Sequence, residues 1–104
     1  MSKGVGTVAT QFLTFGSADD PFVTAGGDAL SGVTMAYETY GQLNADHSNA
    51  ILLFHALSGS QHAAGLNQAV PGTDHRWTEE MHLGWWDSFI GPGRALDTNK
   101  YFVV

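Results

Sequence analysis

The first forty positions of the chain carry the hydrophobic pattern of β-strands. Residues 7–15 are β-branched and aromatic, and residues 22–25 resume that character after an Asp-Asp-Pro break at 19–21. Between residues 33 and 40 a more apolar set of side chains alternates with a more polar set, which is the period of a strand with one covered face. We therefore expect residues 7–40 to form antiparallel strands that lead into a larger sheet.

A different pattern begins at residue 50. Residues 50–57 are nearly all apolar, which predicts a strand buried on both faces, as in a parallel sheet. Residues 101–104 begin a second run of the same kind. About forty residues separate the two runs, and a parallel crossover needs only roughly a dozen. We expect the two strands to be parallel neighbours in an α/β fold.

The segment between these two runs carries weaker signals. Residues 61–83 show no clear period, residues 84–90 predict one or two helical turns, and turns are expected at 91–93 and 97–100. Because the chain stops inside a predicted strand, we expect residues 1–104 to be the N-terminal part of a longer protein.

Composition and charge narrow the range of partners. The 104 residues allow one domain at most, and 43% apolar against 13% charged residues predict a folded chain with much of its surface buried. Ten acidic and four basic residues give a net charge of −6, and the basic ones are scattered along the sequence. A nucleic-acid backbone requires clustered Lys and Arg, and an anionic membrane would repel this chain. We expect neither partner.

Two absences in the sequence argue against further classes of protein. The longest wholly apolar run, residues 50–54, is far shorter than the ~20 residues that span a bilayer, and the first residues carry no apolar stretch as long as that of a signal peptide. The chain has no cysteine, which excludes a disulfide scaffold, a thiolate nucleophile and Cys-ligated zinc within it. The expected compartment is the cytoplasm.

The phrase Phe-His-Ala-Leu-Ser-Gly at residues 54–59 is the most specific candidate for chemistry. Ligands of open α/β sheets bind outside the carboxyl ends of the strands, and small residues there let the backbone approach a substrate closely. The backbone N–H of Leu57 is therefore a candidate donor to a developing oxyanion, a contact worth ~3 kcal/mol in the transition state. In the alternative interpretation, which the local sequence favours, His55 only caps the strand and hydrogen-bonds the following loop.

Several phrases along the chain match one enzyme family in order and spacing. They are AYETYG at 36–41, NAIL at 49–52, HALSG at 55–59 followed by His62 and Ala64-Gly65, GWWD at 84–87 with IGPG at 90–93, and DT at 97–98 with YFV at 101–103. Together they resemble the N-terminal part of the homoserine O-acyltransferases, which are members of the α/β-hydrolase superfamily. One phrase alone would be modest evidence, whereas five in sequence are strong evidence.

The resemblance implies a fold and a reaction. Residues 1–104 would be an incomplete, N-terminal portion of a single α/β-hydrolase domain. The whole enzyme would move an acyl group from acyl-CoA to the hydroxyl of L-homoserine, in methionine biosynthesis, through a serine acyl-enzyme. Acetyl-CoA is the expected donor and succinyl-CoA the alternative. The acyl-CoA is a co-substrate, so no bound cofactor is expected, and the full-length protein is expected to be a homodimer.

The resemblance also implies roles for residues near the HALSG phrase. It places Leu57 in the loop that supplies one oxyanion donor. Many superfamily members have glycine where Ala56 stands. Ala56, Ser58, Gln61 and His62 are the candidate substrate-binding residues, because they lie within or just after this loop.

The catalytic serine itself is not predicted within the chain. Superfamily members carry it on a G-x-S-x-G elbow, and no serine here has a glycine two positions before it. The catalytic Asp and His of the family come later still. We expect the nucleophile and its partners beyond Val104, and no acyltransferase activity from residues 1–104 alone.

Two other functions compete with this one. A generic α/β-hydrolase esterase shares the fold, although the GWWD and GPG phrases argue against it. A non-catalytic binding module is the third possibility, and the open end of the chain argues against that.

The remaining polar and aromatic residues give weaker predictions. Glu38 is expected to make a structural polar contact. Trp85 and Trp86 either line a pocket or, as is commoner, anchor a short helix by burying ~150–250 Å² each. Residues 4–9 match G-x-G-x-x-A but precede a strand, so no dinucleotide site is expected.

No metal site is expected among the histidines and acidic residues of the second half. These residues are His62, Asp74, His75, Glu79, Glu80 and His82. Their spacing matches neither His-x-x-x-His nor His-Glu-x-x-His, and solvated loop positions explain them more simply.

Overall fold

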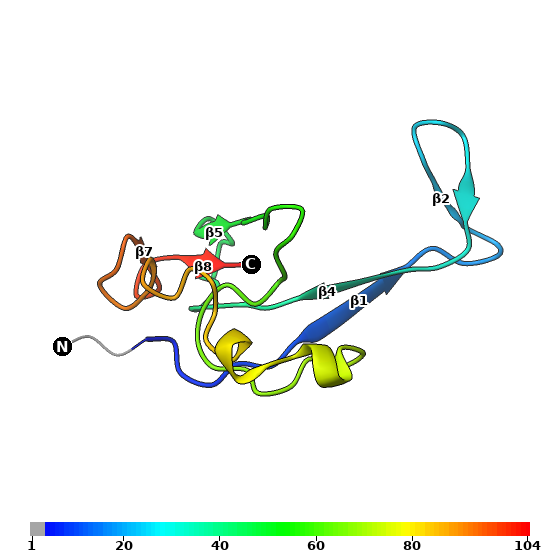
Figure 1. Ribbon diagram of the computed structural model, residues 1–104. Helices are drawn as coiled ribbons and strands as arrows, with labels where there is room; N and C mark the ends of the chain where they lie inside the picture. The colour runs from blue at the N-terminus through cyan, green and yellow to red at the C-terminus, as the bar shows by residue number, and fades with distance from the viewer. Residues whose placement is uncertain (1–3) are drawn as a thin grey trace.

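Two antiparallel pairs of strands form the first part of the computed structural model, which describes residues 4–104. β1 (Gln11–Phe15) pairs with β4 (Val33–Tyr37). β2 (Phe22–Val23) pairs with β3 (Ala29–Leu30), and Figure 1 shows this pair projecting as an arm from the end of the β1–β4 ribbon. The predicted antiparallel strands are confirmed, although the first begins at Gln11 rather than at residue 7.

The predicted parallel pair is also present. β5 (Ala50–Ile51) pairs in parallel with β8 (Phe102–Val103), and the Leu53 N–H donates to the Val104 carbonyl at 2.8 Å. The prediction of a long strand buried on both faces is wrong, because regular pairing stops at Ile51 and the side chains of Leu52 and Phe54 are 67% and 76% exposed. Among residues 4–104, β8 is the only strand paired with β5, so little apolar surface is available to cover this run.

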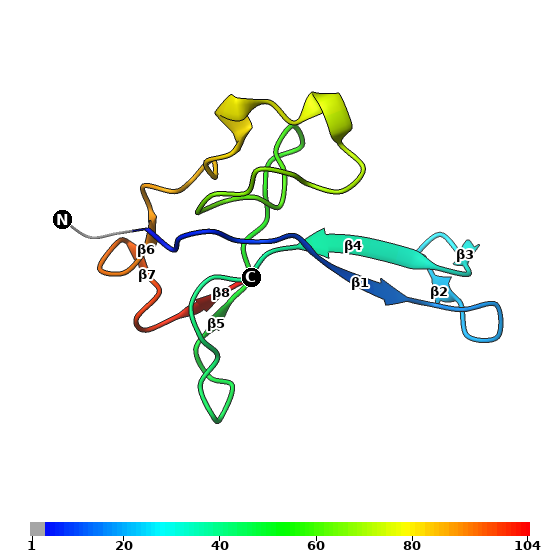
Figure 2. The same ribbon diagram turned by 90° about the horizontal axis from the view of Figure 1, so that it is seen from below.

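The segment between β5 and β8 is mostly irregular. It contains two short 3₁₀ helices, η1 (Asp74–Arg76) and η2 (Glu79–Met81), and a parallel pair of β6 (Ile90–Gly91) with β7 (Leu96–Asp97) that the sequence pattern did not predict. Figure 2 shows the β1–β4 ribbon between the η1–η2 segment and the β5–β8 pair.

The helical turns predicted for residues 84–90 are wrong. This stretch forms consecutive tight turns, in which the Asp87 N–H donates to the Gly84 carbonyl at 3.1 Å. The Trp86 N–H donates instead across the structure to the Ala63 carbonyl at 2.7 Å. The Phe89 N–H donates three residues back, to the Trp86 carbonyl at 2.9 Å, and β6 begins at Ile90, so no i-to-i+4 ladder of an α-helix develops. The predicted turns at 91–93 and 97–100 are confirmed by i-to-i+3 hydrogen bonds.

A small core holds these pieces together. It consists of the buried residues Tyr40, Ala63, Ala64, Ile90 and Val103. Residues 63–64 cross the chain at Gly84 with their backbones in contact, and a Cβ on Gly84 would collide with Ala63 and Ala64. Within the part of the chain that the structure describes, no helix has the length and apolar character needed to cross a membrane.

Candidate functional site

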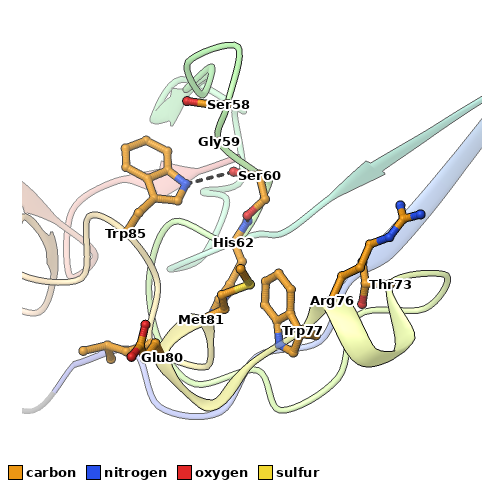
Figure 3. A pocket seen from close by; sticks show the side chains of 11 residues that line it. Ser58, Gly59, Ser60, His62, Thr73, Arg76, Trp77, Glu80, Met81 and Trp85 are labelled. Carbon is orange, nitrogen blue, oxygen red and sulfur yellow. Dashed lines mark hydrogen bonds between the residues drawn. The ribbon is translucent and has the colours of Figure 1, made fainter.

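A cavity of about 460 Å³ opens beside the loop that follows β5 (Figure 3). Three segments form its wall: the loop at 58–62, the η1–η2 region, and the turn at 83–85. The lining residues are Ser58, Gly59, Ser60, His62, Thr73, Arg76, Trp77, Glu80, Met81, Leu83 and Trp85. Most of the wall is apolar, with a few polar groups, which is typical of small-molecule sites.

Leu57 is not among the residues that line this cavity, but it directly precedes Ser58, the first of them along the chain. Residues 56–59 form a tight turn closed by a hydrogen bond from the Gly59 N–H to the Ala56 carbonyl at 2.8 Å. The Leu57 side chain is fully exposed, and within residues 4–104 no acceptor takes a hydrogen bond from its N–H. The amide is therefore available to a ligand rather than used in sheet pairing.

The alternative role of His55 is present at the same turn. Its Nδ1 lies 2.6 Å from the Ala56 carbonyl and donates to it. Such a contact stabilises the turn without involving the Leu57 N–H, so the two interpretations are compatible.

The other predicted binding residues are divided between the cavity and the framework. Ser58 and His62 belong to the wall, whereas Ala56 and Gln61 are not among the lining residues. The Gln61 side chain instead donates from Nε2 to Thr10 Oγ1 at 3.0 Å, which ties the loop to the segment before β1.

The tryptophan pair does not anchor a helix, and that expectation is wrong. Trp85 is 44% exposed, lines the cavity, and donates from Nε1 to the Ser60 carbonyl at 2.8 Å. Trp86 is 37% exposed and stacks on Phe89 with ring centroids 5.0 Å apart. The two tryptophan rings also lie against each other, with centroids 5.5 Å apart and planes inclined at 38°.

Behind the cavity wall lies a buried polar cluster that the sequence did not predict. Glu38 Oε1 accepts hydrogen bonds from Tyr40 Oη at 2.7 Å and from His62 Nδ1 at 2.8 Å, and Glu38 Oε2 accepts one from Asn67 Nδ2 at 3.0 Å. The one feature of the sequence that could have indicated this cluster is the pair of polar side chains, Glu38 and Tyr40, at the end of a predicted strand. Their partners lie more than twenty residues away in sequence, so only the fold brings the cluster together.

The hydrogen bonds of His62 define its protonation state. Its Nδ1 faces a Glu38 carboxylate oxygen, and its Nε2 lies 2.6 Å from the His82 carbonyl. Both partners are acceptors, so only the protonated imidazole can donate to both of them at once. Burial opposes that charge, but the hydrogen bonds to Glu38 and His82 outweigh it and raise the pKa of His62 above its ordinary value.

The Tyr40 hydroxyl is held at the opposite side of the same cluster. It accepts hydrogen bonds from the backbone N–H groups of Ala63 at 2.8 Å and Ala64 at 3.2 Å, while it donates to Glu38. Burial, reinforced by the hydrogen bond to Glu38, raises the pKa of Tyr40 well above its ordinary value. The hydroxyl therefore stays a neutral donor at physiological pH.

The acidic residues and histidines do not converge elsewhere. Among the residues that the structure describes, no three His, Asp or Glu side chains are grouped in a way that could hold a metal ion. A separate ion pair joins Arg94 to Asp87 Oδ2 at 3.1 Å, and Asp87 Oδ1 also accepts the Gly65 N–H at 2.8 Å.

Comparison with known proteins places the chain in context. No family model matches it. It is 48% identical over 98% of its length to a homoserine O-acetyltransferase of Deferribacter desulfuricans, and 47% identical over 98% of its length to a homoserine O-succinyltransferase of Azoarcus sp.. The chain is a homologue of the homoserine O-acyltransferases. It spans about a quarter of the length of these relatives, 24% in both cases.

Solved structures support the same family and fold. A homoserine O-acetyltransferase from Bacillus anthracis superimposes with a TM-score of 0.65 and 39% identity, covering 91% of this chain and 22% of that one. Esterase E22 superimposes with a TM-score of 0.72 and 37% identity, covering 92% of this chain and 23% of that one. The expected fold class, part of an α/β-hydrolase, is confirmed for this homoserine O-acyltransferase homologue.

Proposed function

We propose that this chain is the N-terminal part of an enzyme that transfers an acetyl group from acetyl-CoA to the hydroxyl of L-homoserine. The observation that carries the proposal is the 48% identity, over nearly the whole chain, to a protein named homoserine O-acetyltransferase. The acetyl group would leave the CoA sulfur for a serine oxygen outside residues 1–104. The serine proton would go to the CoA sulfur, which leaves as the thiol. The acetyl group would then pass to the homoserine oxygen, and the proton of that hydroxyl would return to the serine oxygen.

Residues of this chain would form part of the active site, whereas the nucleophilic serine would lie outside residues 1–104. The Leu57 N–H, which has no acceptor within residues 4–104, would donate to the oxyanion of each tetrahedral intermediate. The adjoining cavity of about 460 Å³, with Ser58, His62 and Trp85 in its wall, would hold part of the substrates.

The test is a transfer assay on the whole gene product. Purified protein is incubated with L-homoserine and either acetyl-CoA or succinyl-CoA, and CoA release is followed with a thiol reagent. We expect release that depends on homoserine and is faster with acetyl-CoA. A clear preference for succinyl-CoA would instead support the succinyltransferase named among the relatives. No release with either donor would refute acyl transfer.

An esterase is the second candidate, favoured by the superposition on esterase E22. The same catalytic apparatus would then pass the acyl group to water. The distinguishing measurement is hydrolysis of p-nitrophenyl acetate without homoserine, compared with homoserine-dependent transfer in the same preparation. Rapid hydrolysis that homoserine does not divert would support the esterase. A protein that binds acyl-CoA but catalyses neither reaction would be a binding module.

The setting of the reaction follows from the same proposal. We infer a cytoplasmic enzyme with small-molecule substrates and without a nucleic-acid or membrane partner. Acetyl-CoA would serve as co-substrate, so no bound cofactor is required. The whole protein would be a homodimer, which sedimentation velocity on the gene product would test by giving a mass near twice that of one chain.

A further inference from the structure

The pair formed by Glu38 and His62 has no contact with solvent. Both side chains are 0% exposed, and their closest atoms, Oε1 and Nδ1, are 2.8 Å apart. A buried ion pair is costly unless its remaining hydrogen-bonding groups are satisfied. Here Tyr40 and Asn67 donate further hydrogen bonds to the Glu38 carboxylate, and the His82 carbonyl accepts one from the second imidazole nitrogen of His62. Because both side chains are shielded from solvent, we take the pair to act on the site through the cavity wall, to which His62 belongs.

His62 connects three parts of the cavity wall. Its Nε2 holds the His82 carbonyl at the end of η2, and its own carbonyl accepts the Trp85 N–H at 3.3 Å. Its backbone N–H donates to Ser60 Oγ at 3.3 Å, and its ring lies 5.8 Å from the ring of Trp77. Figure 3 shows His62 between the Ser60 loop and Trp77.

Glu38 supplies the fixed end of this arrangement. It lies just after β4, where Tyr40 forms an isolated bridge with Val103 of β8. Displacement of the His62 ring would therefore move the wall relative to the sheet, while Glu38 stays in place.

We propose that Glu38 and His62 are positioning residues, whose ion pair holds the wall of the cavity in the geometry that acyl transfer requires. The proposal rests on the proposed function for its catalytic consequence, but not for its effect on the cavity. Misplacement of a catalytic group by about 1 Å can cost about 100-fold in rate, so a modest movement of this wall would be measurable.

The arrangement makes the cavity sensitive to pH. The groups that face His62 are Glu38 and Tyr40 from the sheet side and the His82 carbonyl from η2, while Asp87 acts from the turn at 84–87. Arg76 and Glu80 line the same cavity. Because Glu38 and the His82 carbonyl raise the pKa of His62, the pair is intact below its ordinary value of 6.5 and is lost as pH rises through the folded-state value. Loss of either proton leaves a ring nitrogen facing an acceptor.

The experiment follows the cavity and the reaction separately. Acrylamide quenching is measured across pH on the whole gene product with and without Trp77→Phe and Trp85→Phe, so that the difference between the paired measurements isolates the two tryptophans of the wall. We expect a change in quenching as His62 loses its proton. Glu38→Gln should shift the midpoint to lower pH, and His62→Gln should abolish the transition. His75→Gln, which changes an exposed histidine of η1, is the control and should leave the midpoint in place.

The kinetic arm uses the same variants. For His62→Gln and Glu38→Gln we expect kcat per folded protein to fall about 100-fold with a smaller change in KM, and the alkaline limb of the kcat profile to share the quenching midpoint. Should His62→Gln fail to fold, the shift in Glu38→Gln decides the question.

The outcomes separate the two proposals. No transition, or one that persists unchanged in Glu38→Gln and His62→Gln, overturns the positioning role. Unchanged kcat in variants whose quenching transition has moved also overturns it. A transition that behaves as expected in a protein without acyl transfer supports positioning of the cavity and refutes the proposed function instead.

Discussion

Replacing Tyr40 with phenylalanine would remove one hydroxyl from the centre of the core. That hydroxyl accepts the N–H groups of Ala63 and Ala64 and donates to Glu38 Oε1 at 2.7 Å. Phenylalanine fills the same space, so no large cavity forms, but the buried Ala64 amide loses its acceptor and the Glu38 carboxylate loses a donor. The Ala63 amide keeps the Gln61 carbonyl, at 3.1 Å, as an acceptor. At about 1–3 kcal/mol for the orphaned amide and about 1.5–3 kcal/mol for the lost hydrogen bond to the carboxylate, the change amounts to about 2.5–6 kcal/mol. We expect Tyr40→Phe to lower the free energy of unfolding by about 4 kcal/mol, a large part of a typical 5–15 kcal/mol.

Urea unfolding of the whole gene product, followed by tryptophan fluorescence, measures this loss. Tyr101→Phe is the matched control, because it removes a hydroxyl from a side chain that is exposed and makes no hydrogen bond among the described residues. The control should stay within about 0.5 kcal/mol of the wild type. A loss below about 1 kcal/mol for Tyr40→Phe would show that the Ala64 amide and the Glu38 carboxylate find other partners, and the argument from unsatisfied groups would fail.

Three further changes test other parts of the structure. Leu57→Pro removes the candidate oxyanion donor and should lower kcat about 100- to 1,000-fold, whereas Leu57→Ala keeps the amide and should lower kcat far less. Equal loss in the two variants, measured by steady-state kinetics, would refute the donor role. Gly84→Ala should destabilise the protein by about 1–3 kcal/mol in thermal unfolding, because the new Cβ meets the backbone of Ala64. Gly32→Ala places its Cβ in open space and should be nearly neutral. Equal effects of the two changes would count against the close contact between Gly84 and residues 63–64. Hydrogen bonds from two backbone amides lower the pKa of Asp97, so its contribution to stability is present at neutral pH and is lost as pH falls through the folded-state value. Asp97→Asn should therefore be less sensitive to acid in an acid-unfolding titration, and an unchanged acid midpoint would contradict this.

The candidate site shows where local pattern fails. The Leu57 loop could be proposed from its strand and its small residues, which are neighbours in sequence. The prediction for Trp85 is wrong because it assumes a helix at 84–90. This stretch forms turns instead, the Trp86 N–H donates to the Ala63 carbonyl, and Trp85 is exposed. A backbone hydrogen bond to a distant segment leaves no trace in the local hydrophobic period.

Two levels of information can be distinguished in this chain. Alternation at 33–40 and the apolar runs at 50 and 101 were enough to predict the antiparallel strands and the parallel pair, because strand pairing depends on side-chain periodicity that is written locally. The raised pKa of His62 and its contact with Glu38 could be seen only in the folded chain. Burial lowers the pKa of His62, and the shift is upward only because two acceptors from distant segments meet at its ring, which is a property of packing rather than of neighbouring residues.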